Sequence, residues 1–341
     1  MESRAALALS LISGIGPARH AELAARHGST RAAFARQGTS GARRQAMDEA
    51  DALIDRAAGV GARLLVRGRS PYPARLAELH APPPVLWARG SLALFEAPCV
   101  AIVGTRHPTA YGERAARALA AGLASAGAAV VSGMALGIDG VAHVAALDAG
   151  AGSVAVLGTG VDVAYPRVHT ALHRRLGAEG LVVSEEPPGA RPTPGSFPKR
   201  NRIIAALASV VIVVEADVDS GALITAGHGL DIGRTVAAVP GPIDSPRSKG
   251  TNRLLRDGAM VIADPADALA LLGLRAPAER DLSGAPPAER AVWRALGRGA
   301  ADLDALVAST DLPLRDCLAA LTALELAGAV ECAPTGMIIR R

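Results

Sequence analysis

The chain has little lysine, few aromatic residues and few cysteines. Only 2 of its 36 basic residues are lysine, Lys199 and Lys249, and it has 3 Tyr, 3 Phe and 2 Trp. The 3 cysteines form no CxxC pair, so we expect neither a disulfide framework nor a zinc site, and a reducing cytoplasm is favoured. No run approaches about 18 apolar residues and no signal-like segment follows Glu2 and Arg4, so we expect neither a membrane span nor export.

The 341 residues suffice for two or three domains, and the 50% share of hydrophobic residues excludes wholesale disorder. The net charge of +4 is unevenly distributed. Residues 1–95 carry 13 basic and 7 acidic side chains (+6), residues 96–275 carry 16 of each, and residues 276–341 carry 7 against 9 (−2). An excess of positive charge indicates an anionic partner, but the C-terminal end is a poor electrostatic match for DNA.

Residues 1–70 have the apolar spacing of helices and predict a small N-terminal helical domain. Gly14-Ile15-Gly16-Pro17 predicts a tight turn, with proline suited to opening the next helix. This pattern is typical of a helix-hairpin-helix or SAM-like domain. Two interpretations stay open: the glycine turn offers backbone N–H groups to a phosphate, or the short helices simply pack together.

After Pro82-Pro83-Pro84 the pattern changes to short apolar runs that alternate with helical stretches. The runs are 99–103, 128–131, 153–157, 181–183, 210–214, 235–239 and 259–262. Most lack alternation with polar residues, as is typical of strands covered on both faces. Residues 71–275 therefore predict an α/β core, extended Rossmann-like, with a doubly wound and mainly parallel sheet.

Residues 276–287 are rich in proline, glycine and charge and predict a linker. Residues 288–341 predict three helices and a two-stranded wing, which indicates a winged-helix domain. Its third helix has Arg315 as its only cation, beside Asp316 and Glu325, whereas a helix that reads a DNA groove normally carries several basic or amide side chains. We therefore expect this domain to have a protein-contact or packing role. A third alternative, in which the domain binds duplex DNA, is disfavoured.

Three glycine turns follow predicted strands and open helices. Gly104-Thr105-Arg106 offers close backbone approach, a hydroxyl and a bidentate cation in front of a helix N-terminus, which together favour a phosphate cradle. A second turn begins with Ser132-Gly133 and a third with Ser220-Gly221, the latter followed by Thr225. In a doubly wound sheet ligands bind beyond the carboxyl ends of the strands, where these turns are expected to lie.

The cationic block at 197–202 is the most informative stretch. It consists of Phe197, Pro198, Lys199, Arg200, Asn201 and Arg202, and it enters a helix. A charge run is usually a solvated face, but this one follows a proline-rich loop and contains one of the two lysines. The ring of Phe197 could stack on any base, since each base has a π-face. With so few aromatics elsewhere, we expect phosphate contacts to dominate affinity.

Several enzyme and cofactor motifs are absent from the sequence. There is no G-x-x-x-x-G-K-[ST], H-E-x-x-H or G-x-S-x-G, and the first turn is not G-x-G-x-x-G. Asp139 with His143, and His169 with His173, have the i,i+4 spacing that metals use, but neither pair has an evident third ligand. We predict capping, hydrogen-bonding or surface roles for them, with no metal and no cofactor.

The motifs occur in a succession that resembles one known family. They are VGTRHPTAYG (103–112), SGMALGID (132–139), AVLGTGVDVAYP (155–166), SEEPPG (184–189), FPKRNRIIA (197–205), VEADVDSGALITA (214–226), AVPGPI (238–243) and GTNRLLRDGA (250–259). In order and spacing this resembles the DNA-processing protein A family, DprA or Smf, over about residues 65–270, and its order is far more specific than any single loop. Helical N-terminal and winged-helix C-terminal domains also suit that family.

The resemblance implies a bacterial cytosolic protein that binds and protects single-stranded DNA and loads RecA recombinase onto it during natural transformation. It implies a homodimer without enzymatic activity. Single-stranded DNA-binding protein (SSB), which coats such DNA, is a further expected partner. The implied DNA contacts are led by Arg106 and Lys199, supported by Gly104, Thr105, Ser132, Gly133, Phe197, Arg200, Asn201 and Arg202, with Ser220, Gly221 and Thr225 as further phosphate-cradle candidates. Leu136 departs from the family, because many relatives have arginine there, so one cation near the pocket is missing.

A Rossmann-like nucleotide-binding protein or a phosphoribohydrolase-type enzyme is the alternative. The same cradle would suit a nucleotide monophosphate, and Glu215 and Asp217 stand near a strand end where acid/base groups could act. However, the P-G-G-x-G-T-x-x-E motif of the lysine-decarboxylase-like phosphoribohydrolases is absent. We therefore expect these carboxylates to cap a helix or order a loop.

Overall fold

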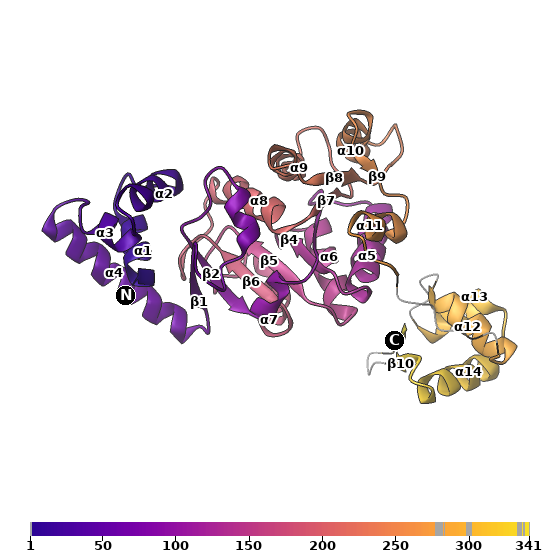
Figure 1. Ribbon diagram of the computed structural model, residues 1–341. Helices are drawn as coiled ribbons and strands as arrows, with labels where there is room; N and C mark the ends of the chain where they lie inside the picture. The colour runs from indigo at the N-terminus through magenta and orange to yellow at the C-terminus, as the bar shows by residue number, and fades with distance from the viewer. Residues whose placement is uncertain are drawn as a thin grey trace. The chain divides into compact units, whose positions relative to one another are not determined.

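The computed structural model describes residues 2–276, 282, 284–297, 302–332, 336 and 338–340 (Figure 1). The chain forms two compact units, Met1–Pro277 and Ala278–Arg341. Half of the predicted linker at 276–287, residues 277–281 and 283, lies outside the described residues. Among the described residues, no helix combines the length and the apolar character needed to span a bilayer.

Four helices open the first unit: α1 (Glu2–Leu11), α2 (Pro17–Arg26), α3 (Thr30–Phe34) and α4 (Ser40–Gly59). Ser29 and Thr39 cap α3 and α4 by accepting hydrogen bonds from backbone N–H groups, as short hydroxyl side chains favour. Pro17 is the first residue of α2, as the sequence predicts. These helices share a hydrophobic core with the sheet, in which Leu9 of α1 belongs to the same buried cluster as Trp87.

A nine-stranded sheet forms the centre of this unit. Its strands are β1 (Arg63–Val66), β2 (Val85–Gly90), β3 (Cys99–Val103), β4 (Ala129–Ser132), β5 (Ser153–Leu157), β6 (Leu181–Ser184), β7 (Val210–Val213), β8 (Thr235–Ala238) and β9 (Met260–Val261). Their order is β1-β2-β6-β5-β4-β3-β7-β8-β9, and strands β3 to β9 pair in parallel. The doubly wound, mainly parallel sheet is thus confirmed.

Two antiparallel strands, β1 and β2, extend the sheet beyond the sequence prediction. β1 lies within the segment 1–70 that was predicted to be helical, so the helical assignment holds only as far as the end of α4 at Gly59. β1 has four residues and begins with an exposed arginine, which leaves too short an apolar run to distinguish a strand from a helix by periodicity.

Helices cover both faces of the sheet (Figure 1). On one face, α5 (Ala110–Ser125), α6 (Ile138–Asp148) and α11 (Pro265–Leu271) bury alternate strand residues such as Val100 and Ile102. On the other, α8 (Ser196–Leu207) and α9 (Gly221–Asp231) bury Ala101 and Val103. The remaining elements are α7 (Thr170–Glu179), α10 (Pro246–Arg256) and the short 3-10 helices η1 (Ala74–Glu78), η2 (Leu92–Phe95) and η3 (Arg167–His169).

The second unit contains α12 (Pro287–Gly297), α13 (Leu303–Thr310) and α14 (Leu314–Leu326), followed by the antiparallel hairpin of β10 (Val330–Cys332) and β11 (Ile338–Arg340). Trp293, Leu306 and Leu324 belong to its buried core. Three helices and a two-stranded wing are the elements that the sequence predicts for a winged helix. Arg315 is the one cation within α14.

Candidate nucleic-acid interface

The loops after β3 and β7 meet where the strand order reverses. From β3 the chain builds the sheet in one direction through β4, β5 and β6, and from the neighbouring β7 it builds in the other direction. The backbone N–H of Thr105 donates to the carbonyl oxygen of Glu215 at 2.7 Å, which ties the two loops together. Open α/β sheets bind ligands at such a switch point, so these loops form the candidate site.

The first glycine turn presents Arg106 to solvent. Arg106 is exposed, and in the described part of the chain its guanidinium takes part in no hydrogen bond or ion pair. The turn beneath it is ordered, because Oγ1 of Thr105 accepts from the backbone N–H of His107 at 3.2 Å. A Cβ on Gly104 would lie 2.6 Å from Cγ1 of Ile138, so packing against the side chain of Ile138 leaves room for glycine here. Arg106 is therefore an available cation on a fixed turn.

Glu215 caps the helix that follows this turn. Its carboxylate accepts from the backbone N–H of Thr109 at 2.9 Å and from Oγ1 of Thr109 at 2.5 Å, just before α5 begins. A carboxylate at a helix N-terminus is favoured by the helix dipole. The interpretation of Glu215 as a capping group is thus confirmed. Asp217 accepts from the neighbouring backbone N–H of Val218, which is a loop-ordering contact.

The second turn is organised by Asp139, the acidic residue in the first turn of α6. Its carboxylate accepts from the backbone N–H groups of Gly133 at 3.1 Å and Ala135 at 3.3 Å. Burial raises the pKa of Asp139, and the positive charge of Arg200 and these hydrogen bonds oppose that rise. Ser132 is fully buried and donates to the carbonyl oxygen of Ile102 at 2.7 Å. The side chains of Ser132 and Asp139 therefore hold the backbone in place beneath the surface.

Arg200 lies inside the protein, only 7% exposed. Its guanidinium donates to the carbonyl oxygens of Gly133 and Val156, and its Nε donates to Oδ1 of Asn201 at 3.0 Å. Burial lowers the pKa of Arg200 to about 10, with Arg106 adding to the effect and Asp139 opposing it. Arg200 thus joins the ends of β4 and β5 to α8. Its positive charge is buried beneath the loops of the candidate site.

The other two cations of the 197–202 block, Lys199 and Arg202, face two carboxylates. Nζ of Lys199 lies 3.3 Å from Oε1 of Glu186 and 3.4 Å from Oε2 of Glu185. Arg202 pairs with Glu185 at 2.6 Å and also donates to the carbonyl oxygen of Ala81 at 3.0 Å. Arg202 is therefore fixed between two loops, whereas Lys199 is exposed and its ion pairs are of the weak surface kind. Neither glutamate is among the site residues predicted from the sequence, although their position directly after a strand was a usable signal.

Two aromatic rings lie together beside the block. The ring centroids of Phe197 and Tyr165 are 5.2 Å apart at an interplanar angle of 32°. Tyr165 is 43% exposed, while Phe197 is half-buried. Of these two rings only Phe197 was predicted from the sequence. The usable signal for Tyr165 was its place as a rare aromatic residue near the end of the motif at 155–166. The pair offers one exposed aromatic face at the carboxyl edge of the sheet.

The third turn caps α9. Oγ of Ser220 accepts from the backbone N–H of Ala222 at 3.3 Å, and Thr225 is buried. Nδ2 of Asn201 donates to the carbonyl oxygen of Gly221 at 3.2 Å, which connects this turn to the cationic block. Asn201 therefore links two of the predicted site segments, while Gly221 remains exposed.

The histidine pairs make hydrogen bonds within the protein. Nδ1 of His143 lies 2.7 Å from Oγ of Ser153, Nδ1 of His169 lies 3.1 Å from the carbonyl oxygen of Met134, and Nε2 of His173 lies 2.9 Å from that of Val161. Burial lowers the pKa of His143 to about 3. Within the described ranges, no group of three or more His, Cys, Asp and Glu side chains is arranged to hold a metal ion.

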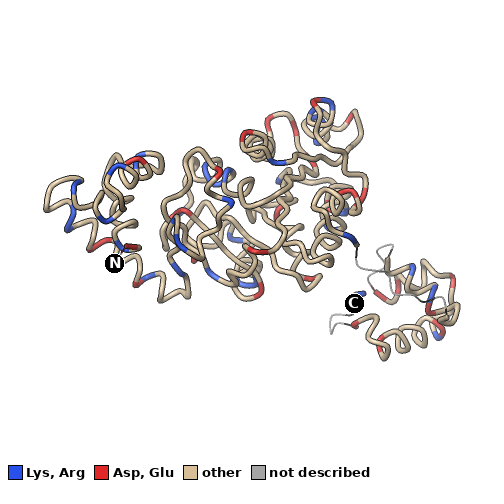
Figure 2. Tube along the Cα trace, viewed as in Figure 1, with Lys and Arg blue, Asp and Glu red and all other residues tan. Residues whose placement is uncertain are grey.

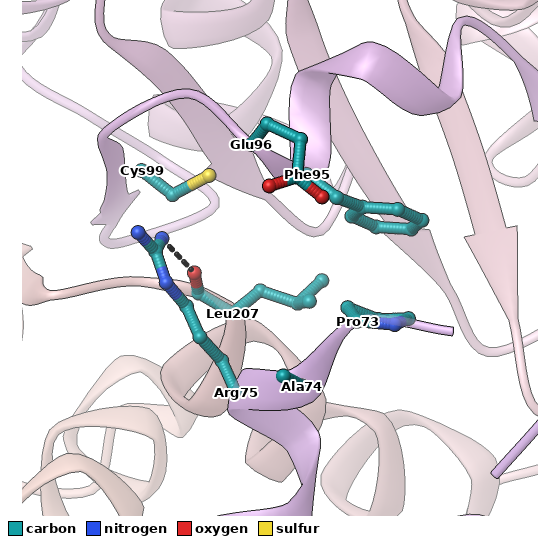
Figure 3. A pocket seen from close by; sticks show the side chains of 7 residues that line it. All are labelled: Pro73, Ala74, Arg75, Phe95, Glu96, Cys99 and Leu207. Carbon is teal, nitrogen blue, oxygen red and sulfur yellow. Dashed lines mark hydrogen bonds between the residues drawn. The ribbon is translucent and has the colours of Figure 1, made fainter. Parts of the chain in front are cut away.

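A cavity of about 150 Å³ opens at the other end of the strands, next to Cys99, the first residue of β3 (Figure 3). Arg75 spans it and donates to the carbonyl oxygen of Leu207 at 3.1 Å. Burial raises the pKa of the Cys99 thiol, so this cysteine is held in its unreactive form. This cavity is separate from the carboxyl-edge loops.

The fold and loops define a Rossmann-like protein with glycine turns and cationic residues at the carboxyl edge of its sheet, joined to a winged-helix unit. The family model for DNA recombination-mediator protein A matches residues 63–273, and the model for the DprA winged helix domain matches residues 276–336. The chain belongs to the DprA family of DNA recombination-mediator proteins.

Curated relatives and solved structures agree with this membership. A relative in Mycobacterium tuberculosis is 44% identical over 288 residues, which are 80% of this chain and 70% of the relative. The structure of DNA processing protein A from Streptococcus pneumoniae aligns with a TM-score of 0.71 at 30% identity, over 79% of this chain and 98% of that one. A structure of the Helicobacter pylori protein, described by its single-stranded DNA binding mode, aligns with a TM-score of 0.57 at 33% identity, over 62% of this chain and 95% of that one.

Proposed function

We propose that this chain binds single-stranded DNA across the carboxyl edge of its parallel strands, protects it and loads RecA recombinase onto it. The observation that carries the proposal is Arg106, an exposed arginine on an ordered turn at the switch point, without a counterion among the described residues. Arginine binds phosphate through a planar fork of donors, and phosphate contacts supply most of the affinity for a nucleic-acid strand.

In this proposal the predicted residues divide into two groups. Arg106 and Lys199 contact phosphates, and the Tyr165–Phe197 pair stacks on a base. The others position the loops: Gly104, Thr105, Ser132, Gly133, Arg200, Asn201, Arg202, Ser220, Gly221 and Thr225. The Helicobacter pylori relative, whose structure concerns single-stranded DNA binding, supports the choice of ligand.

The proposed role is binding in the cytoplasm, without catalysis or a cofactor. The phosphoribohydrolase alternative needs a carboxylate free to position substrate, but Glu215 is 3% exposed and is bound to Thr109 by both oxygens. The described residues offer no observation that favours the phosphoribohydrolase alternative.

We further propose a homodimer. β9 stands at the edge of the sheet, and its two residues, Met260 and Val261, are 50% and 55% exposed. Ile243, in the loop after β8, is 92% exposed. An unpaired strand edge with apolar side chains is a ready surface for pairing with another chain, and a second copy would give two DNA-binding edges.

Binding of a labelled dT oligomer, followed by fluorescence anisotropy, tests the site. Arg106→Ala with Lys199→Ala should lose most of the affinity while the unfolding transition stays unchanged. Arg63→Ala with Arg174→Ala removes two exposed arginines elsewhere and serves as the control. Binding by the first variant at the strength of the control would refute the site.

RecA filament assembly on SSB-coated single-stranded DNA tests the loading role. We expect faster assembly with the wild-type protein and no acceleration with the Arg106→Ala, Lys199→Ala variant. Strong DNA binding without any acceleration would limit the function to protection of the strand.

A further inference from the structure

The N-terminal helices contain a long segment without acidic residues. Between Glu22 and Asp48 there is no Asp or Glu. The segment carries four arginines on α3, on the loop that follows it and on the first turns of α4, which we term the α3–α4 arginine cluster: Arg31, Arg36, Arg43 and Arg44. Basic positions recur along α3 and the start of α4 (Figure 2). Three of the four side chains are exposed, and Arg43 is half-buried.

The cluster lacks the counterions that three other arginines of these helices have. Arg4 is paired with Asp51, and Arg19 and Arg26 share Glu22. None of the four cluster arginines forms an ion pair with a carboxylate in the described part of the chain. The carboxylate of Glu2 comes near but accepts from the backbone N–H of Arg31, at 3.2 Å.

The hydrogen bonds of the cluster go to backbone oxygens and leave its charge uncompensated. Nη1 of Arg43 donates to the carbonyl oxygens of Gln37 at 3.2 Å and Gly38 at 2.7 Å, so its charge is held against the loop that also contains Arg36. Nη1 of Arg36 donates to the carbonyl oxygen of Ala32 at 3.4 Å. Four positive charges therefore lie within fourteen consecutive residues, 31 to 44, without a carboxylate to compensate them.

We propose that the α3–α4 arginine cluster is a second contact surface for the phosphate backbone of the same DNA strand. The inference rests on the proposed single-stranded DNA binding and extends it to the N-terminal helices. Several arginines spread over two helices and the loop between them suit a polymer with a charge at every unit, since each contact releases a counterion and none requires a particular base.

Helix α4 connects the cluster directly to the DNA-binding edge. Near its other end, Nη1 of Arg56 donates to the carbonyl oxygen of Pro188 at 3.4 Å. Pro188 lies in the loop after β6, the same loop that supplies Glu185 and Glu186 to the cationic block. The shared hydrophobic core fixes this arrangement, because the N-terminal helices and the sheet bury their apolar side chains in one cluster.

The length of α4 also sets how much DNA is needed to reach both the DNA-binding edge and the arginine cluster. Arg43 and Arg56 are thirteen residues apart on α4, which at about 1.5 Å per residue corresponds to about 20 Å. A strand with stacked bases advances about 3.4 Å per nucleotide, so about six further nucleotides reach from the loop after β6 to the cluster. Short oligomers should therefore occupy the edge alone, and longer ones should also reach the cluster.

The experiment compares affinities for dT oligomers of about 6, 12 and 24 nucleotides, chosen to fall short of and to exceed this reach. The test variant is Arg31→Gln/Arg36→Gln/Arg44→Gln, which spares Arg43 because of its bonds to the loop. The control is Arg19→Gln/Arg26→Gln, which removes arginines already paired with Glu22. Unchanged urea unfolding of both variants shows that the helices remain folded.

We expect the test variant to match wild type on the shortest oligomer and to bind the longest about tenfold more weakly. The slope of log K against log salt for the longest oligomer should become shallower by about 2, from about 0.7 per lost phosphate contact. The control should match wild type at every length.

Failure of the proposed function and failure of the second contact surface give different results in this experiment. If the wild-type protein binds no oligomer, the proposed function itself fails. If the test variant keeps the full gain in affinity with length, as it would if the cluster served an acidic protein segment, the second surface is refuted. Equal weakening at every length would also overturn it, because that result reflects general charge alone.

Discussion

The guanidinium of Arg200 occupies the space in which a side chain on Gly133 would stand. A Cβ on Gly133 would collide with Nη1, Nη2 and Cζ of Arg200, and the same guanidinium donates a hydrogen bond to the carbonyl oxygen of Gly133. The second glycine turn and the cationic block are thereby locked together. The absence of a side chain at Gly133 leaves room for the guanidinium, and the guanidinium holds the end of β4 in place.

Gly133→Ala should therefore destabilise the protein through overpacking, by about 1–3 kcal/mol. The same substitution in an Arg200→Ala background should cost clearly less, because the colliding atoms are gone, so the two changes should be non-additive. Urea unfolding of the wild type, both single variants and the double variant measures this coupling. Additive effects would show that the two residues do not share this space in solution.

The sheet was predictable where strands are covered on both faces. The runs at 99–103 and 153–157 coincide with β3 and β5, because a continuous run of small β-branched and aliphatic residues is what a strand buried on both faces requires. β2 was missed because Val85–Gly90 mixes a tryptophan, an arginine and a glycine and follows three prolines, so its apolar signal is short.

The candidate site was predictable as a set of segments but not as a set of contacts. Glycine turns after strands located the loops, since parallel strands all end at one edge. The burial of Arg200 could not be read from its neighbours, because its acceptors, Gly133 and Val156, lie far away in the chain. The pairing of Lys199 with Glu186 is likewise a contact between two loops.

Glu215→Gln should weaken the structure of the first turn. The substituted side chain would keep one acceptor oxygen but would replace the other with an amide nitrogen that cannot accept from Thr109, and the negative charge at the start of α5 would be lost. We expect a loss of about 1–2 kcal/mol in the free energy of unfolding, in the range of a lost helix cap. Urea unfolding measures it, and Asp217→Asn, on an exposed loop residue, is the control. Equal stability of both variants would contradict the capping role.

Glu186→Gln should strengthen binding of single-stranded DNA. Glu186 lies 3.3 Å from Nζ of Lys199, so removing its charge leaves only Glu185, at 3.4 Å, to compete with a phosphate for the lysine, and it removes a like charge from the strand's path. We expect a several-fold gain at low salt that fades as ions screen the site. Anisotropy titrations at two salt concentrations measure it, with Glu179→Gln, which is paired with Arg175 on α7, as the control. A weaker binding variant would show that Glu186 orients Lys199 productively.

Val261→Asp should convert the proposed homodimer to a monomer. Val261 is 55% exposed on the edge strand β9, and a charge at a pairing edge opposes association. Light scattering coupled to size exclusion measures the mass. Val168→Asp, at a valine of η3 that is 73% exposed, is the control and should leave the dimer intact. A dimer that survives Val261→Asp would place the interface elsewhere.

Acidification should destabilise the protein in part through His143. Oγ of Ser153 donates its proton to the carbonyl oxygen of Val130 at 2.9 Å, so Nδ1 of His143 is the donor to Ser153, and a second proton on the buried Nε2 would find no acceptor among the described residues. Burial lowers the pKa of His143 from 6.5 to about 3, and the positive charges of Arg200 and His169 act in the same direction. The folded protein therefore resists a proton that the unfolded chain accepts near pH 6.5.

This difference in proton binding decides the direction in which stability changes with pH. Between pH 6.5 and about 3 the unfolded chain binds one more proton at His143 than the folded protein does, so the free energy of unfolding falls as the pH falls, by up to about 1.4 kcal/mol per pH unit. His143→Gln removes this contribution and should flatten the dependence of stability on pH by about one proton, while His80→Gln, at an exposed histidine, should not. Urea unfolding between pH 7 and pH 4 measures both slopes. If the His143→Gln variant retains the wild-type slope, His143 is not held neutral in the folded protein.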